Sequence, residues 1–236
     1  MVFHKASSRG YAKHGWLETH HSFSFASYYN PEMMGFGVLR VINDDSIAPG
    51  QGFGRHPHEN MEIITIPLSG SLAHEDSMGS QAVIQTGEIQ VMSAGTGVEH
   101  SEWNASKAEA VTLLQIWILT RENGVAPRYD QKVFDPLLYK NNLYTVVGPE
   151  ESEKSGALFI HQDAFLSLGQ FDTDTSIEYS IKKKGNGVYL FVIDGVARID
   201  DQRLEKRDAL GVWDTENVSL QVQKRSYILV LEVPMQ

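Results

Sequence analysis

Residues 50–62 read Gly-Gln-Gly-Phe-Gly-Arg-His-Pro-His-Glu-Asn-Met-Glu, and this stretch indicates both the fold and the chemistry of the chain. His56 and His58 are two residues apart, so in an extended strand their side chains project from the same face. Pro57 between them lacks an N–H and fits the start or the edge of a strand. Two neutral imidazoles side by side are metal ligands that need partners. The stretch therefore predicts half of a metal site on a β-strand.

A second pair of ligand-type side chains lies in residues 95–102, Gly-Thr-Gly-Val-Glu-His-Ser-Glu. His100 and Glu102 are again two apart and share one strand face. Several short strands separate the two pairs, enough to bring them together across a small barrel. Three imidazoles and one carboxylate suit a mononuclear divalent transition metal, with Fe(II) preferred and Ni, Co, Mn, Cu or Zn as alternatives. Glu62 is a competing carboxylate, because it shares the face of His58 if that strand is regular.

The rest of the chain predicts many short strands separated by glycine-rich turns, which is typical of a β-sandwich or barrel. Residues 38–42 form a short strand that Asn43-Asp44-Asp45 closes. His74, in His-Glu-Asp, could line the site or support its ligands, but a strand-end residue in a polar turn is the favoured interpretation. No long amphipathic helix is indicated. Further strands are expected at 61–67, 71–76, 82–86, 88–92, 98–103 and 111–119.

The second half of the sequence repeats the pattern of the first. Residues 63–76 and 188–201 each contain an apolar strand, a turn ending in Gly70 or Gly195, and a second strand that ends in acids. Such a repeat indicates a duplicated β-barrel, one copy in each half. The second copy lacks the histidine pair. We therefore expect an N-terminal barrel with the metal site at 1–130, a loop-rich connector at 131–154 and a diverged, metal-free barrel at 155–236.

Composition narrows the classes of function. The 236 residues include 20 basic and 30 acidic side chains, a formal charge of −10, which argues against direct nucleic-acid binding and against binding to anionic membranes. No cysteine is present, so thiolate metal sites and disulfides are excluded. The start of the chain has no apolar segment typical of a signal peptide, and no apolar run approaches membrane-spanning length. We expect a cytoplasmic, cofactor-dependent protein.

Three segments in order resemble the pirin family of cupins. They are Gly-Phe-Gly-Arg-His-Pro-His at 52–58, His-Glu-Asp-Ser-Met-Gly at 74–79 and Met-Ser-Ala-Gly-Thr-Gly-Val-Glu-His-Ser-Glu at 92–102. The resemblance covers the first half well, whereas the second half fits the diverged second cupin of that family. It implies an all-β bicupin, two tandem antiparallel jelly-roll barrels, with one metal in the N-terminal barrel. The metal ligands of the family match His56, His58, His100 and Glu102.

The resemblance also implies a function. Several bacterial pirins open the flavonol quercetin with O2 and release carbon monoxide, whereas the animal member is a nuclear, iron-dependent transcriptional coregulator. The first hypothesis is therefore a flavonol dioxygenase acting on a small aromatic substrate, with Glu102 as metal ligand and base. The second is a metal- and redox-responsive module that binds a regulatory protein. The third is a cupin acting on another small molecule, for which Arg55 is the only adjacent basic residue.

Aromatic residues before the first motif are candidates for the roof of a pocket. Packing on the barrel is the favoured interpretation for most of them. They are Phe23, Phe25, Tyr28, Tyr29 and Phe36.

Overall fold

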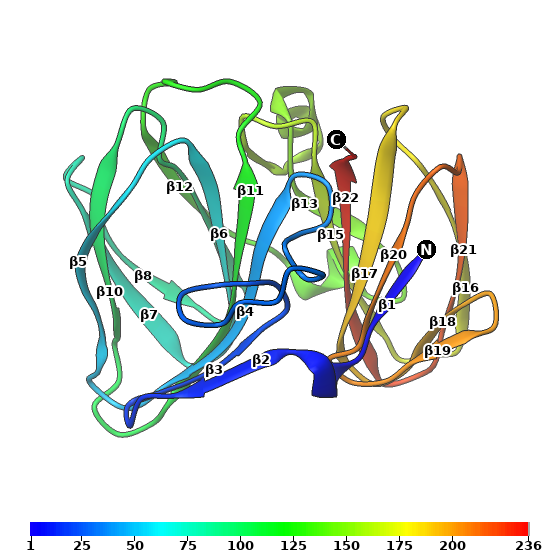
Figure 1. Ribbon diagram of the computed structural model, residues 1–236, viewed down its shortest axis with the longest axis horizontal. Helices are drawn as coiled ribbons and strands as arrows, with labels where there is room; N and C mark the ends of the chain where they lie inside the picture. The colour runs from blue at the N-terminus through cyan, green and yellow to red at the C-terminus, as the bar shows by residue number, and fades with distance from the viewer. Residues whose placement is uncertain (236) are drawn as a thin grey trace.

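The computed structural model describes residues 1–235 and consists of two β-barrels that lie side by side (Figure 1). Each barrel is built from one seven-stranded and one four-stranded sheet. Three short 3-10 helices lie outside the sheets, and within residues 1–235 no helix is long and apolar enough to cross a membrane. The helices are η1 (Ala6–Ser8), η2 (Pro136–Tyr139) and η3 (Glu150–Ser155).

The first barrel contains eleven strands in two sheets. The large sheet contains β12 (Arg128–Val133), β9 (Glu88–Ser93), β6 (Met61–Ser69), β11 (Val111–Leu119), β4 (Leu39–Ile47), β3 (Leu17–His21) and β2 (Gly10–Lys13), in that spatial order. The small sheet contains β5 (Gly52–His58), β10 (Val98–Asn104), β7 (Ser71–Asp76) and β8 (Gln81–Gln85).

The second barrel repeats this arrangement. Its large sheet contains β1 (Val2–His4), β20 (Ala209–Val212), β17 (Asn186–Asp194), β22 (Ser226–Pro234), β15 (Phe165–Phe171), β13 (Tyr144–Gly148) and β14 (Leu158–Phe159), in that spatial order. Its small sheet contains β16 (Thr175–Ser180), β21 (Asn217–Val222), β18 (Ala197–Ile199) and β19 (Gln202–Leu204).

The strand orders confirm the predicted fold of two tandem, mainly antiparallel barrels. The hairpin from β6 to β7 corresponds to the hairpin from β17 to β18, and each turns at a glycine in the left-handed region. The φ angle is 75° at Gly70 and 85° at Gly195. A side chain is strained at such an angle, which explains why the predicted repeat has glycine at both turns.

The first strand of the chain belongs to the second barrel. Val2, Phe3 and His4 of β1 pair with β20, at the sheet position that β12 holds in the first barrel. The predicted boundaries at residues 130 and 155 stay a proposal. The stretch expected to be a loop-rich connector contains β13, which pairs with β15 of the second barrel.

Strand β4 is longer than the sequence indicates. It continues to Ile47, and Asn43 and Asp45 are both buried in it rather than closing it as a turn. Polar residues in sequence normally indicate a turn. Here Asn43 and Asp45 alternate along a strand whose inner face lines a cavity, so the predicted strand end at residue 42 is wrong.

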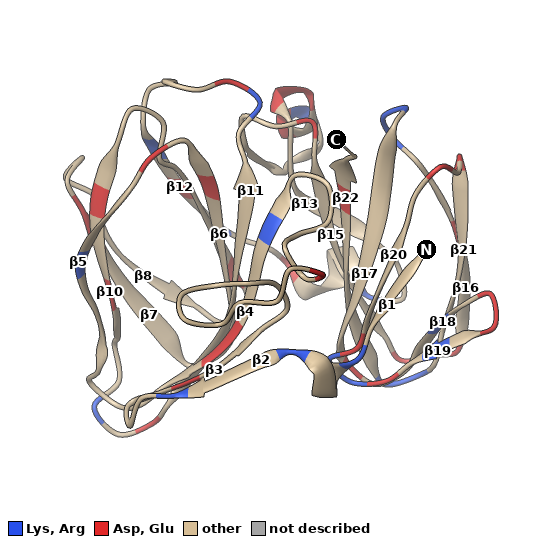
Figure 2. Cartoon of the chain, viewed as in Figure 1, with Lys and Arg blue, Asp and Glu red and all other residues tan. Residues whose placement is uncertain are grey.

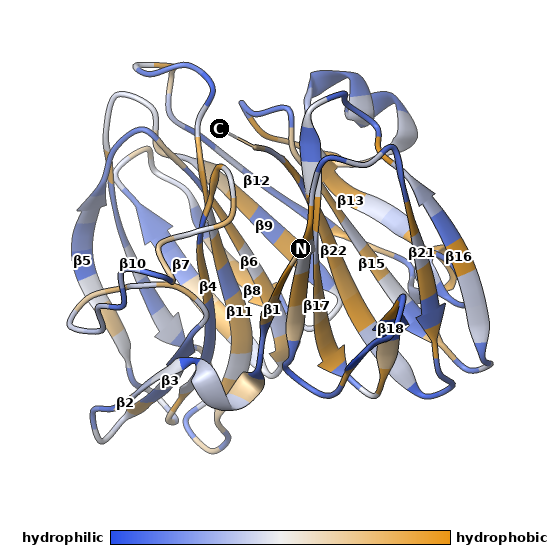
Figure 3. Ribbon diagram, turned by 45° about the vertical axis from the view of Figure 1, so that its right-hand side comes forward, coloured by the Kyte–Doolittle hydropathy of each residue, from blue (hydrophilic) through white to orange (hydrophobic). Residues whose placement is uncertain are grey.

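Hydrophobic packing differs between the two barrels. One large cluster joins the two seven-stranded sheets and contains Ile64 and Ile116 from the first barrel and Leu166 and Leu229 from the second. Figure 3 accordingly shows the most hydrophobic strands, among them β17 and β22, in the centre of the molecule. The second barrel is filled by a single apolar cluster. The first barrel has two smaller clusters, which leaves room for polar residues between them.

A partly buried ion-pair cluster links the two halves of the chain. The carboxylate of Asp44 lies 3.1 Å from Nη1 of Arg9 and 2.8 Å from Nε of Arg207. Figure 2 shows basic residues on the segment between β1 and β2, where the chain passes from the second barrel to the first. Burial by itself would raise the pKa of Asp44, but hydrogen bonds and charge from Arg207 and Arg9 outweigh it and hold the pKa below its ordinary value.

Replacing Asp44 with alanine is expected to lower the free energy of unfolding at pH 7 by about 2 to 4 kcal/mol, somewhat less than for a fully buried pair, because two partly buried guanidinium groups lose their counter-ion. Because its folded pKa is lowered, Asp44 stabilises the wild type above the unfolded pKa of about 4, and this contribution is lost as pH falls below it. Urea denaturation at pH 7 and pH 3 measures both effects. The exposed pair of Lys140 with Asp172 provides the control, since Asp172→Ala should cost under about 1 kcal/mol.

Candidate metal centre

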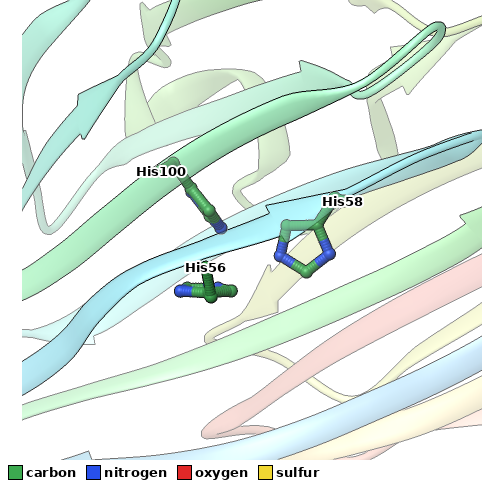
Figure 4. A group of neighbouring side chains, drawn as sticks. All are labelled: His56, His58 and His100. Carbon is green, nitrogen blue, oxygen red and sulfur yellow. The ribbon is translucent and has the colours of Figure 1, made fainter.

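Three histidines converge on the inner face of the small sheet of the first barrel. His56 and His58 lie on β5, and His100 lies on the neighbouring strand β10, directly opposite His56 in the register. The ring centroids are 4.4 Å apart for His56 and His100, 4.8 Å for His58 and His100, and 4.9 Å for His56 and His58. Figure 4 shows the three side chains pointing toward one another from the two strands. One nitrogen of each ring lies within 4.8 Å of the others, close enough to hold one metal ion.

Glu102 lies next to this cluster, on the same strand as His100. A register shift in β5 between His100 and Glu102 places Phe53 opposite Glu102. The carboxylate is buried, and its Oε2 accepts a hydrogen bond of 2.8 Å from Nε2 of Gln115 on β11. Its Oε1 has no hydrogen-bond partner among the described residues. Glu102 groups within 4.8 Å with His100 and His74, so His100 is shared by two sets of ligand-type atoms.

His74 is buried beside His100, where the sequence had placed it in a polar turn. It is 3% exposed, lies opposite Glu102 in the register of β7 with β10, and stacks on Tyr129 at 4.8 Å. The favoured interpretation of His74 as part of a polar turn is therefore wrong, whereas the alternative, a position beside the candidate ligands, agrees with the structure. The alternation His74, Asp76 along β7, two residues apart like the other two pairs, is the signal that could have found it.

Hydrogen bonds connect Asp76, His74 and His100 in a chain that determines which ring nitrogens carry protons. Nε2 of His74 lies 3.2 Å from Oδ2 of Asp76, and Nδ1 of His74 lies 3.4 Å from Nδ1 of His100. An ionised Asp76 only accepts, so His74 donates from Nε2 and accepts at Nδ1. His100 then donates from Nδ1, which leaves the lone pair on its Nε2 directed away from this chain of hydrogen bonds.

The free atoms of the cluster fit a metal ion. Nε2 of His100 and Oε1 of Glu102 are both buried and both lack a hydrogen-bond partner in the described part of the chain. Nδ1 of His56 lies 2.8 Å from the carbonyl oxygen of Gly54, to which it donates when neutral, so Nε2 of His56 keeps its lone pair. Burial, with a smaller effect of neighbouring His56, lowers the pKa of His58 to about 4, and burial also lowers the pKa of His100. Neutral imidazoles at pH 7 are metal ligands.

Replacing Asp76 with asparagine is expected to weaken metal binding about 10- to 100-fold, as is usual when the partner of a metal-binding histidine is lost. The amide nitrogen of the variant would donate to Nε2 of His74, which reverses the proton positions in His74 and His100 and puts a proton on Nε2 of His100. Competition with a chelator of known affinity measures the dissociation constant for Ni(II). Asp130→Asn, a change at a partly exposed acid of the same barrel, is the control. Unchanged affinity in Asp76→Asn would rule out the hydrogen-bond chain as the reason for ligand orientation.

Glu62, the competing carboxylate, lies outside the histidine cluster. It is fully buried on β6 and accepts a hydrogen bond of 2.6 Å from Oγ of Ser93. By strand alternation it shares its face with Ile64, which packs between the barrels, whereas Ile63 faces the interior of the first barrel. Burial raises the pKa of Glu62 to about 7, opposed by Ser93 and by the backbone of His161. The expectation that Glu62 shares the face of His58 fails, because Glu59 and Asn60 break the extended chain between β5 and β6 and Asn60 has a φ of 48°.

A cavity of about 400 Å3 opens against the histidine cluster. Its wall contains His56, His58 and Glu102 on one side and residues of β3, β4 and β11 on the other. Cavities of this size accommodate small organic ligands. Five aromatic residues are candidates for a pocket roof. Of these, Phe25 lines the cavity, whereas Phe23 and Phe36 pack between the barrels. The cavity walls also contain Trp16, Phe53, Trp117, His21, Asn43 and Asp45.

The fold and the site together define a bicupin with a candidate metal centre in its N-terminal barrel. Residues 2–118 match the family model described as Pirin, and residues 145–233 match the model of the quercetinase C-terminal cupin domain. A quercetin 2,3-dioxygenase from Escherichia coli K12 is 43% identical over 99% of both chains. The chain belongs to the pirin family, as the sequence motifs predicted.

Other members of the family are similar to this chain in sequence and in structure. A pirin-like protein from Caulobacter vibrioides is 36% identical over 94% of this chain and 95% of its own. The crystal structure of the bacterial pirin YhhW from Escherichia coli in complex with nickel(II) matches with a TM-score of 0.93 and 41% identity, covering 100% of this chain and 99% of that one. A second crystal structure of YhhW gives a TM-score of 0.94, with 42% identity and coverage of 100% and 98%.

Proposed function

We propose that the protein is a metal-dependent dioxygenase that opens the ring of a flavonol such as quercetin with O2 and releases carbon monoxide. The observation that carries this proposal is the cluster of three imidazoles with the adjoining carboxylate of Glu102, in which Nε2 of His100 and Oε1 of Glu102 have no hydrogen-bond partner among the described residues. His56, His58 and Glu102 of this set line an aromatic-walled cavity. The name of the 43% identical relative supports the reaction. The cytoplasmic location and the role as a metal-responsive protein-binding regulator remain predictions.

His56, His58, His100 and Glu102 are the proposed ligands of a single divalent metal. The nickel(II) in the YhhW structure supports a divalent ion of this class. Fe(II) remains the preferred ion for an oxygen-dependent reaction at a site of histidine and carboxylate ligands. When bound, the metal supplies a positive charge that stabilises the deprotonated 3-hydroxyl group of the flavonol and a fixed position for it.

The side chains of the cavity bind and orient the substrate. Trp117 contacts His58 at 4.9 Å between ring centroids, and Phe25 contacts Trp117 at 5.2 Å, so these rings form one apolar wall beside the ligands. A flat aromatic substrate would stack on this wall and displace water from the reaction site. Glu102 accepts the proton of the 3-hydroxyl group. The hydrogen bond from Gln115 holds its carboxylate in place, and burial raises its pKa to about 7.

An aerobic assay tests the proposal. Purified protein is stripped of metal, reloaded with Fe(II) or Ni(II) separately, and mixed with quercetin in air. We expect the loss of flavonol absorbance to match the release of carbon monoxide, one molecule for each molecule of O2 consumed. The control is the same metal concentration without protein. No carbon monoxide, and no loss of absorbance beyond that control with either metal, would rule the reaction out.

A further inference from the structure

We propose that the carboxyl group of Asp45 hydrogen-bonds a second hydroxyl group of the substrate, so that the site selects polyhydroxylated aromatic molecules. This inference rests on the proposed function, because it concerns the same cavity. It adds a residue outside the predicted ligand set and a chemical criterion for the substrate.

Asp45 lies on the wall of the cavity formed by the large sheet. It is 5% exposed and lines the cavity, with Thr19 beside it on β3 and Leu113 beside it on β11. His56 and His58 belong to the small sheet, so a ligand in the cavity contacts both sheets. A substrate held by the metal at one hydroxyl group can therefore present another group to Asp45.

The carboxyl group of Asp45 has no cationic partner among the described residues. Its Oδ1 is buried and has no hydrogen-bond partner within residues 1–235. The other carboxylates near it are Asp44 and Glu102. Burial, together with the charge of Asp44, raises the pKa of Asp45 to about 7. Asp44, its neighbour in sequence, is instead paired with two arginines.

A buried carboxyl group without a cation destabilises the folded protein. Such a group is expected where a ligand completes its hydrogen bonds. Other polar side chains of this wall are already partnered. Nδ1 of His21 lies 2.7 Å from Oδ1 of Asn43, and Oε1 of Gln115 accepts a hydrogen bond from Nε1 of Trp117. The free Oδ1 of Asp45 is thus the acceptor available on this wall.

Hydroxyl groups of phenols are the donors that suit such an acceptor. A carboxylate or phosphate group placed beside Asp45 would be repelled by its carboxylate. Trp16 and Phe53, in contact at 5.1 Å between ring centroids, provide aromatic surface in the same cavity. The chemistry therefore favours an uncharged aromatic molecule with hydroxyl groups beyond the one that binds the metal.

Binding measurements without oxygen test this inference. The Ni(II)-loaded protein is titrated anaerobically with quercetin, which has five hydroxyl groups, and with 3-hydroxyflavone, which has only the reacting one, and tryptophan fluorescence gives each dissociation constant. Loss of a hydrogen bond to a charged group is expected to raise the quercetin constant about tenfold or more in Asp45→Ala. The constant for 3-hydroxyflavone should change less than about twofold. Asp45→Asn, which keeps a neutral acceptor, should lie between wild type and Asp45→Ala for quercetin.

Stability and a control variant separate binding from folding. We expect Asp45→Asn to melt at or above the temperature of wild type, since it removes an unpaired buried carboxyl group. Thr65→Val removes another buried, unpartnered polar atom that does not line the cavity, and it should leave both dissociation constants unchanged. Equal weakening of both flavonols in Asp45→Ala would overturn the inference while quercetin turnover by wild type would still support the proposed function. If wild type binds neither flavonol, both proposals fail.

Discussion

Replacing His56 and His58 together with alanine is expected to reduce the metal content from about one ion per chain to almost none and to abolish flavonol consumption. The two residues supply half of the proposed ligands, and a site that retains only His100 and Glu102 binds a divalent ion far more weakly. The fold should persist, because both side chains are only partly buried on an outer strand of the small sheet. Elemental analysis of the purified variant measures the metal.

A histidine outside the cluster provides the matched control. His14 is exposed in the turn between β2 and β3, so His14→Ala should retain the metal content and the activity of wild type. Circular dichroism of the double variant verifies that the β-structure is intact. Equal metal content in wild type and in the folded double variant would show that the site assignment is wrong.

Glutamine at position 102 is expected to lower flavonol consumption about 100- to 10 000-fold, the range typical for loss of a general base. Glu102 has a second proposed role as a ligand, so the affinity for metal should fall as well. The glutamine side chain keeps the shape of the glutamate and can still accept a hydrogen bond from Gln115 through its carbonyl oxygen. The variant therefore tests charge rather than packing.

The same substitution at Glu62 separates the two candidate carboxylates. Glu62→Gln preserves an acceptor for Oγ of Ser93, and its side chain is turned toward the space between the barrels. Its activity and metal affinity should stay within about twofold of wild type, as expected for a residue outside the reacting groups. Steady-state rates at saturating metal, together with chelator competition, compare the two variants. A larger loss in Glu62→Gln than in Glu102→Gln would reverse the assignment of the carboxylate ligand.

Strand alternation and local motifs made much of the site predictable. His56 and His58, two residues apart, needed only the period of a strand to place them on one face. The glycines at positions 70 and 195 indicated equivalent turns, and hence two barrels, because a left-handed turn requires a residue without a Cβ atom. These features depend on neighbours in sequence, which a single chain displays directly.

The residues that the sequence misplaced depend on pairing between distant strands. His74 and Asp45 each belong to a run of polar residues that resembles a turn. Only the pairing of β7 with β10 brings His74 beside His100, and only the closure of the barrel encloses Asp45. The direction of Glu62 likewise depends on the bend at Asn60 rather than on its spacing from His58. No periodicity of one strand contains this information.

The position of β1 also has a consequence for the order of folding. Val2, Phe3 and His4 are synthesised before every strand of the first barrel, whereas their partners Ala209, Leu210 and Gly211 are synthesised after all of them. During synthesis β1 therefore remains unpaired until β20 has been made. Meanwhile β1 stays attached to the first barrel, which can fold much earlier. The chain thus passes between the two barrels twice, once between β1 and β2 and once between β12 and β13. Cleavage of the chain between β12 and β13 would therefore leave the large sheet of the second barrel without β1.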